Sequence, residues 1–218
     1  MKIEYEPYHI GSKIKFYVDK ITLISKLQNY YNGKFEDYEV NPNPFNRESF
    51  LIPTITILSN DIDKIFIQVN LSGNALNIIG NEPKTVYKAF ETLLESLHEV
   101  GYDLKSTFSF YEIITNIILT LEIEINPKDI FKKITLPKFT QIHNISDIMV
   151  NQIKFSNRFT LAESEERFEM EIYPNLTNPE HSIRLRILNR KLDPDKIKEV
   201  HNNIEDFIKD FYQKLLKD

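Results

Sequence analysis

The sequence predicts an α+β protein in which two similar β-α-β-β-β-α repeats form an antiparallel curved sheet, with helices packed on one face. Three observations lead to this prediction. Short stretches of alternating apolar and polar residues indicate strands, two long segments with apolar residues at helical spacing indicate helices, and the same order of elements occurs twice in 218 residues. The expected repeats are 1–104 and 105–218, either as two units or as one continuous domain.

The first repeat is expected to begin with a strand at 9–18, with Phe16 among its apolar residues, and a short helix. Asp19 is a suitable N-cap for that helix, and Gly33 can end it. The apolar residues of one helical face are Leu23, Ile24, Leu27 and Tyr31. A short edge strand is then expected at 35–40, before a proline-containing loop.

Three further strands and a long helix complete the first repeat. The strands are expected at 50–58, 64–70 and 74–79. Pro83 is placed to start the helix and Gly101 to end it. The helix has a broad apolar stripe made of Val86, Ala89, Phe90, Leu93, Leu94, Leu97 and Val100.

The second repeat follows the same order. Its long first strand at 107–125 has apolar residues at Tyr111, Ile113, Ile117, Leu119, Leu121 and Ile123. A short helix at 127–134 and strands at 148–155, 167–173 and 182–188 follow. Pro194 starts the last helix, and aligning it with Pro83 matches four apolar positions of the two long helices. These pairs are Val86 with Ile197, Leu93 with Ile204, Leu97 with Ile208, and Val100 with Phe211.

A short stretch carries a family resemblance. The segment IFIQVNLSGNALNIIG at 65–80, followed by the helix ending at Val100-Gly101, resembles a repeat of the TATA-box-binding protein family. That resemblance implies two repeats that form one curved, saddle-shaped sheet. Family members that bind DNA wedge paired phenylalanines into the minor groove and read it with asparagines from the open side of the sheet.

The residues expected on the open side of this sheet are the candidate binding site. They are Phe66, Gln68, Asn70, Asn77, Phe108, Phe110, Asn116, Arg184 and Arg186. In the second repeat, the outward positions Arg167, Glu169 and Glu171 join the two arginines. Opposite charges on neighbouring strands predict a salt-bridged, solvated face, and carboxylates there would repel phosphate. The net charge of −5 also disfavours nucleic acid.

Several kinds of chemistry are not supported by the residues. The chain has no cysteine, which excludes disulfides and thiolate chemistry, and it contains no phosphate-binding glycine loop or nucleophile elbow. The five histidines, at 9, 98, 143, 181 and 201, lack metal-ligand spacing and are interpreted as surface or boundary residues. Glu122 and Glu124 could form a carboxylate pair, but a solvated strand face is preferred. No cofactor or metal is expected.

The sequence therefore favours a non-catalytic interaction protein that uses the open face of the sheet. A protein partner or a homo-oligomer is preferred over nucleic acid. The alternative is a small-molecule-binding or enzymatic domain with a pocket between the sheet and a long helix, and a third hypothesis is a structural oligomer subunit. Without a signal peptide or an apolar segment long enough to span a bilayer, we expect a cytoplasmic protein that does not use a membrane.

Overall fold

The computed structural model of this chain describes residues 1–34, 38–40, 54–57, 65–70, 74–120, 152–157, 166–178 and 181–217. Within these ranges, the side chains of 32–34, 38–40, 54–57, 65–70 and 215–217 are not described. The expected loop at 41–46, the short helix at 127–134 and the end of the strand predicted at 107–125 lie outside the described residues.

Nine strands and four helices make up the described part of the chain. The elements of the N-terminal part are β1 (Lys2–Ile14), α1 (Lys20–Lys34), β2 (Tyr38–Val40), β3 (Thr54–Ile57), β4 (Ile65–Asn70), β5 (Ala75–Gly80), α2 (Pro83–Glu99) and α3 (Leu104–Thr107). Those of the C-terminal part are β6 (Phe108–Thr120), β7 (Ile153–Ser156), β8 (Arg167–Pro174), β9 (Ser182–Lys191) and α5 (Pro194–Lys217).

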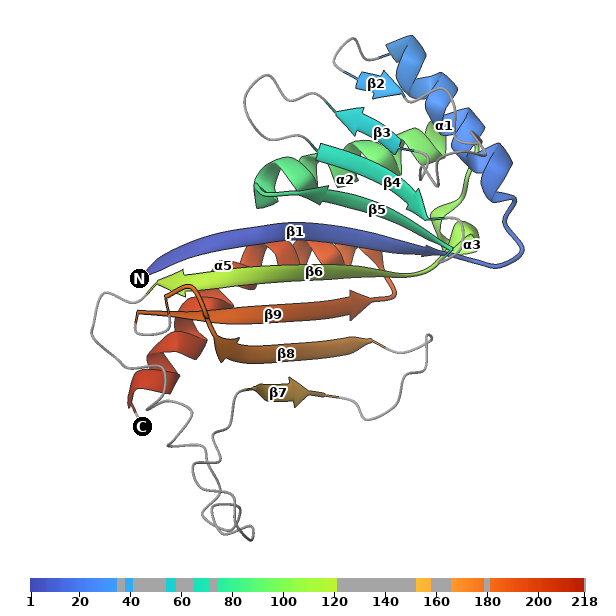
Figure 1. Cartoon of the computed structure of the whole chain (residues 1–218). Helices are drawn as coiled ribbons and strands as arrows, with labels where there is room; N and C mark the ends of the chain where they lie inside the picture. Colours follow the sequence, from blue (N-terminus) through green and yellow to red (C-terminus); the bar gives the residue numbers. More distant parts are fainter. Residues whose placement is uncertain are drawn as a thin grey trace, which may run out of the picture.

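The strands form a single antiparallel sheet in the order β2-β3-β4-β5-β1-β6-β9-β8-β7. β1 and β6 lie side by side at its centre, with Ile10 opposite Ile113. The long helices α2 and α5 both lie behind the sheet in the view of Figure 1. The prediction of an α+β fold with an antiparallel sheet is therefore confirmed.

The core lies between the sheet and these two helices. Alternate residues of the central strands point into it, including Ile10, Ile78, Ile113, Ile117, Leu185 and Ile187, all at most 1% exposed. The matching helix residues are Val86, Leu93 and Leu97 on α2 and Ile197, Ile204 and Ile208 on α5. Burial of these side chains supplies the main driving force for folding.

The helix ends follow the expected capping chemistry. The Asp19 carboxylate accepts hydrogen bonds from the backbone N–H groups of Ile21 and Thr22, so it caps α1. Glu82 accepts a hydrogen bond from the Thr85 N–H at the start of α2, where Pro83 occupies the first helical position. Gly101 follows α2 with a φ of 87°, a conformation that favours glycine.

The limits of β1 differ from the prediction. The strand begins at Lys2 rather than His9, because a bulge between Tyr5 and Tyr8 accommodates Pro7 within the ladder. It ends at Ile14, and Phe16 lies in the following turn with 87% of its surface exposed. Of the described helices, none combines the length and the apolar character needed to cross a membrane.

Candidate functional site

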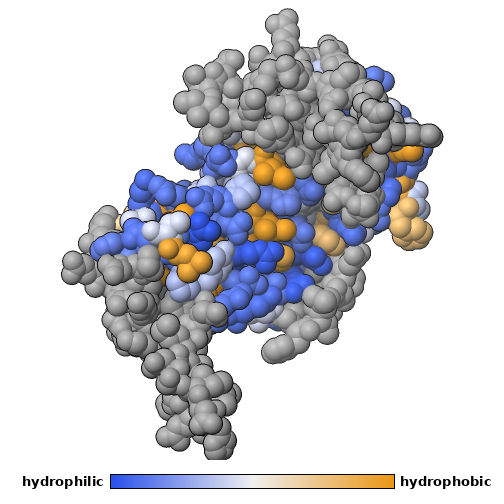
Figure 2. Space-filling view, in the orientation of Figure 1, coloured by the Kyte–Doolittle hydropathy of each residue, from blue (hydrophilic) through white to orange (hydrophobic). Residues whose placement is uncertain are grey.

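The side of the sheet away from α2 and α5 is called the open face here. Figure 2 shows this face in the orientation of Figure 1, and within its coloured part most residues are hydrophilic, with separate hydrophobic patches near the centre. The strand register determines which described residues share it. Their chemistry divides the face into an apolar row, a set of ion pairs and a small polar cluster.

The apolar row crosses four strands at the centre of the sheet. His9 on β1 lies opposite Ile79 on β5 and Ile114 on β6, and Ile114 lies opposite Leu188 on β9. Ile79, Ile114 and His9 are partly exposed, while Leu188 is 9% exposed. The apolar row is the set Ile79, Ile114 and Leu188, with His9 between Ile79 and Ile114.

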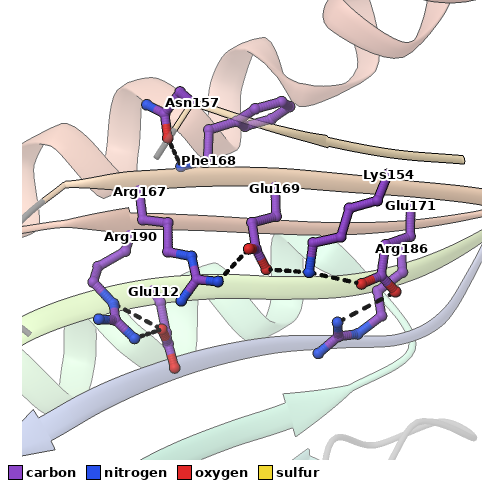
Figure 3. A network of polar contacts seen from close by, with 9 residues as sticks. All are labelled: Glu112, Lys154, Asn157, Arg167, Phe168, Glu169, Glu171, Arg186 and Arg190. Carbon is purple, nitrogen blue, oxygen red and sulfur yellow. Dashed lines mark hydrogen bonds and ion pairs between the residues drawn. The ribbon is translucent and has the colours of Figure 1, made fainter. Parts of the chain in front are cut away.

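Ion pairs cover the half of the open face formed by β6, β9, β8 and β7. Seven residues take part and are called the charged ladder: Glu112, Lys154, Arg167, Glu169, Glu171, Arg186 and Arg190 (Figure 3). Arg190 donates to the Glu112 carboxylate from Nε and Nη2 at 3.2 and 3.1 Å. Lys154 Nζ lies 3.2 Å from carboxylate oxygens of both Glu169 and Glu171. Ion pairs are therefore confirmed for the predicted residues Arg167, Glu169, Glu171 and Arg186. The predicted solvation does not hold for Glu169, which is buried.

Glu169 is the most buried member of the charged ladder, with 5% of its surface exposed. Burial alone would raise the pKa of Glu169, but hydrogen bonds from Arg167 and Lys154 outweigh burial and hold that pKa below its ordinary value. Arg186 Nη1 lies 3.5 Å from Glu171. Each cation of the charged ladder is thus paired with a carboxylate on the same face of the sheet.

Three polar side chains converge over Gly11 in the middle of the open face. A Cβ atom at Gly11 would lie 3.3 Å from Asn77 Oδ1, 3.5 Å from His9 Nε2 and 3.6 Å from Glu112 Cγ. Because glycine has no side chain, these groups can close over the backbone of β1. Burial lowers the pKa of His9, while Asn77 and Glu112 act in the opposite direction. The neutral form of the His9 imidazole is therefore favoured.

Four of the predicted binding residues, Asn77, Asn116, Arg184 and Arg186, are partly exposed on the open face. Asn77 lies beside Gly11, and Asn116 lies opposite Arg186. Arg184 lies opposite Tyr173, and its guanidinium is 3.4 Å from Glu6. The predicted residues of β4, which are Phe66, Gln68 and Asn70, pair with Ile79, Asn77 and Ala75 of β5 in the backbone ladder. The side chains of these three residues are outside the described part.

The two predicted phenylalanines of β6 are not available for binding. Phe108 lies in the core between sheet and helices and is 4% exposed, so its assignment to the open face is wrong. The register shift between Lys13 and Ile14 puts Phe108 opposite Ile14 and reverses its direction. Phe110 belongs to the open face, but it is 5% exposed because the Arg190 guanidinium stacks 3.7 Å from its ring centre.

An aromatic cluster on the helix side was not predicted. His201 of α5 is stacked on Tyr87 of α2, with ring centres 4.3 Å apart, and it is hydrogen-bonded to the Tyr8 hydroxyl of β1. Burial lowers the pKa of His201 and raises the pKa of Tyr87 to about 12. No group of three or more acidic or histidine side chains in the described ranges is arranged to hold a metal ion, and Glu122 and Glu124 lie outside those ranges.

Comparison with known proteins finds several solved structures with a similar fold. The fold is similar to that of Methanococcus jannaschii TBP at 14% sequence identity and a TM-score of 0.34, covering 96% of this chain and 99% of that one. No family model matches the sequence. No curated protein matches it either.

Proposed function

We propose that this chain is a non-catalytic interaction module that binds a second copy of itself through the open face. The observation that carries the proposal is the balance of charge on that face. The charged ladder contains four cations, Lys154, Arg167, Arg186 and Arg190, and three carboxylates, Glu112, Glu169 and Glu171, which are paired with one another. Two faces of this kind do not repel each other as two strongly basic faces would.

The apolar row supplies the anchor for such contact. Ile79 and Ile114 are partly exposed on either side of His9, and polar side chains flank them along the strands. Protein interfaces commonly combine an apolar centre with a polar rim. Burial of the apolar row against another copy would gain roughly 25 cal/mol for each Å² of apolar surface removed from water.

The same face is a poor surface for nucleic acid. DNA binding depends on cations that exchange their counterions for phosphates. The arginines of the charged ladder already have carboxylate partners, and those carboxylates would approach the phosphates. We therefore favour a protein over a nucleic acid as the partner of the open face.

We also propose the finer architecture expected from the sequence, which is a duplicated, TATA-binding-protein-like fold. The strand order supports it, because β5, β4 and β3 follow β1 outward just as β9, β8 and β7 follow β6. Each part has one long helix that starts at a proline, α2 at Pro83 and α5 at Pro194. An experimental structure in which β1-β5-β4-α2 cannot be superposed on β6-β9-β8-α5 would contradict the duplication.

Self-association is tested by measuring the molar mass of the purified full chain by light scattering over a wide range of concentration. We expect a dimer that dissociates on dilution. Ile114→Lys should shift the equilibrium to monomer, while the matched control Leu176→Lys should not, because Leu176 is 89% exposed in a turn away from the apolar row.

Circular dichroism establishes that each variant is folded, and Ile79→Lys replaces Ile114→Lys if the latter does not fold. A chain that stays monomeric at every concentration overturns the proposal. A dimer that neither open-face variant weakens also overturns it, because the interface would then lie elsewhere.

A further inference from the structure

A cavity of about 410 Å³ lies between β8, β9 and α5, on the side of the sheet opposite to the open face. Its volume is within the range of about 300–1,000 Å³ that is typical of small-molecule sites. In Figure 3, Phe168 points away from the charged ladder and toward the helices. The cavity therefore lies on the other side of the sheet from the surface proposed for self-association, and Arg167 is the one charged-ladder residue that lines it.

Five apolar or aromatic residues and seven polar or charged residues line the cavity, and apolar atoms make up the larger part of its wall. Ile187 of β9 and Ile204 of α5 are buried at 1% and 5% exposure. Phe168 of β8 and Phe207 of α5 lie edge to face, with ring centres 5.5 Å apart. Phe207 is 39% exposed, so one aromatic ring is accessible to an entering molecule. Such walls favour a flat apolar or aromatic ligand.

Asn189 is a polar residue in the otherwise apolar helix-side series of β9. The helix-side residues of β9 are Ile183, Leu185 and Ile187, each at most 1% exposed, and the next residue in the series is Asn189. Asn189 lies opposite Ile113 and Phe168 in the ladder and lines the cavity. Among the described residues, none forms a hydrogen bond with its side-chain amide, which offers one donor group and one acceptor side by side.

The charged groups near the cavity balance one another. Lys191 and Lys196 lie 3.1 and 2.8 Å from the two carboxylate oxygens of Glu166. The hydrogen bond from Lys196, together with Lys191, holds the pKa of Glu166 below its ordinary value, so the carboxylate stays ionised at neutral pH. Glu199 of α5 adds a second negative charge. The charged residues that line the cavity are the cations Arg167 and Lys191 and the anions Glu166 and Glu199, so a charged ligand gains little here.

We propose that this cavity binds an uncharged planar heterocycle that carries an adjacent hydrogen-bond donor and acceptor, the chemistry of a nucleobase. Asn189 pairs with the donor–acceptor edge, in the way that asparagine amides recognise adenine. Phe168 and Phe207 contact the ring. The site is on the helix side of the sheet, so it does not depend on self-association through the open face.

The test is calorimetric titration of the full chain with adenosine, and with AMP and indole for comparison. We expect adenosine to bind with a dissociation constant of about 0.1 mM, from the usual affinity per non-hydrogen atom. Asn189→Leu should weaken that affinity about tenfold, since one buried hydrogen-bonding partner is lost. Phe207→Ala should weaken it too, whereas Asn116→Leu, on the open face, should not.

Three results overturn the proposal. One is the absence of adenosine binding up to its solubility limit. Another is adenosine binding that Asn189→Leu and Phe207→Ala both leave unchanged. The third is a preference for indole, or for AMP in a salt-dependent manner, which would mean an apolar or an anion site. The molar mass of each variant shows independently whether self-association is retained, so the two proposals fail separately.

Discussion

The hydroxyl of Tyr8 and Nδ1 of His201 lie 2.9 Å apart, although 193 residues separate them in the chain. Tyr8 belongs to the central strand β1 and is fully buried, while His201 belongs to α5. The His201 ring also stacks on Tyr87 of α2. The imidazole of α5 thus contacts two elements of the N-terminal part, β1 and α2.

Removing the Tyr8 hydroxyl should destabilise the protein. Tyr8→Phe keeps the ring but deprives His201 of its partner, so we expect the free energy of unfolding to fall by about 1 kcal/mol. Urea denaturation followed by circular dichroism measures it. The control is Tyr17→Phe, which loses a hydrogen bond to the Ser106 carbonyl in an exposed setting and should change stability little. Equal stability of Tyr8→Phe and the wild type would contradict the prediction.

Stability should also depend on pH through His201. Burial holds its pKa in the folded state below the ordinary value of about 6.5. The folded state therefore binds fewer protons than the unfolded state, and stability falls as the pH drops from about 6.5 through the lower folded pKa. His201→Gln should lose less stability than the wild type between pH 7.5 and 5.5. His9→Gln, measured in parallel, separates the similar contribution of His9, and identical pH profiles of His201→Gln and the wild type would exclude this role.

Filling the space above Gly11 should cost stability. In an ordinary strand, exchanging glycine for alanine is favourable, but here the new methyl group would lie 3.3 Å from Asn77 Oδ1. We expect Gly11→Ala to destabilise the protein by about 1 kcal/mol because the packed Asn77 side chain must shift. The double variant Gly11→Ala with Asn77→Ala should recover most of this loss. If Gly11→Ala is more stable than the wild type, the prediction is wrong, because Asn77 can then move aside at little cost.

The charged ladder should lose stability when its buried carboxylate is neutralised. Glu169→Gln leaves Arg167 and Lys154 without one countercharge, so we expect a loss of about 1–2 kcal/mol at pH 7. Glu205→Gln is the control, because it removes an exposed ion pair in which Glu205 lies 3.9 Å from Lys209. We expect it to lower the free energy of unfolding by less than about 0.5 kcal/mol. The two variants are compared by urea denaturation.

The pH dependence of the same pair of proteins gives a second measurement. The pKa of Glu169 is lowered in the folded state, so its contribution is complete above the unfolded value of about 4.3 and is lost as the pH falls through the folded pKa. The difference between wild type and Glu169→Gln should therefore shrink below about pH 4. A constant difference from pH 7 to pH 3 would mean that charge is not its cause.

Duplex DNA should bind weakly or not at all. Fluorescence polarisation with a labelled duplex at low salt should give no saturable signal, since the arginines of the charged ladder are neutralised within the protein. A dissociation constant in the micromolar range that rises steeply with salt would reverse the preference for a protein partner.

The regular parts of the fold could be predicted because local signals marked them. Asp19 and Pro83 gave helix starts to within one residue, and Gly101 gave the end of α2. The alternation from Tyr111 to Leu119 correctly identified the side of β6 that faces the core. The start of β1 was harder to predict, because charged residues and a proline near Lys2 are not typical of a strand. Pairing with β6 is what makes this segment extended.

The site residues depended on features that a single sequence does not show. Phe108 was assigned to the wrong face because a bulge between β1 and β6 changes the direction of its side chain. No local sequence pattern indicates that bulge. The partner of Arg190, Glu112, could not be chosen before the register of β6 and β9 was known. For Asn189 the sequence contains a local signal, because this polar residue follows a series of apolar residues at alternate positions of β9.

The central position of the β1–β6 pairing has a consequence for how the chain acquires its structure. Each of these strands has its other neighbour, β5 or β9, within its own part of the sequence, but the ladder between them joins distant segments. Contacts between distant segments slow folding because a large loop must close first. During synthesis, β1 emerges long before β6 and retains one hydrogen-bonding edge without its partner, which is a point at which other chains can attach. The nascent protein is therefore most exposed to misassembly at the strand that later lies deepest in its sheet.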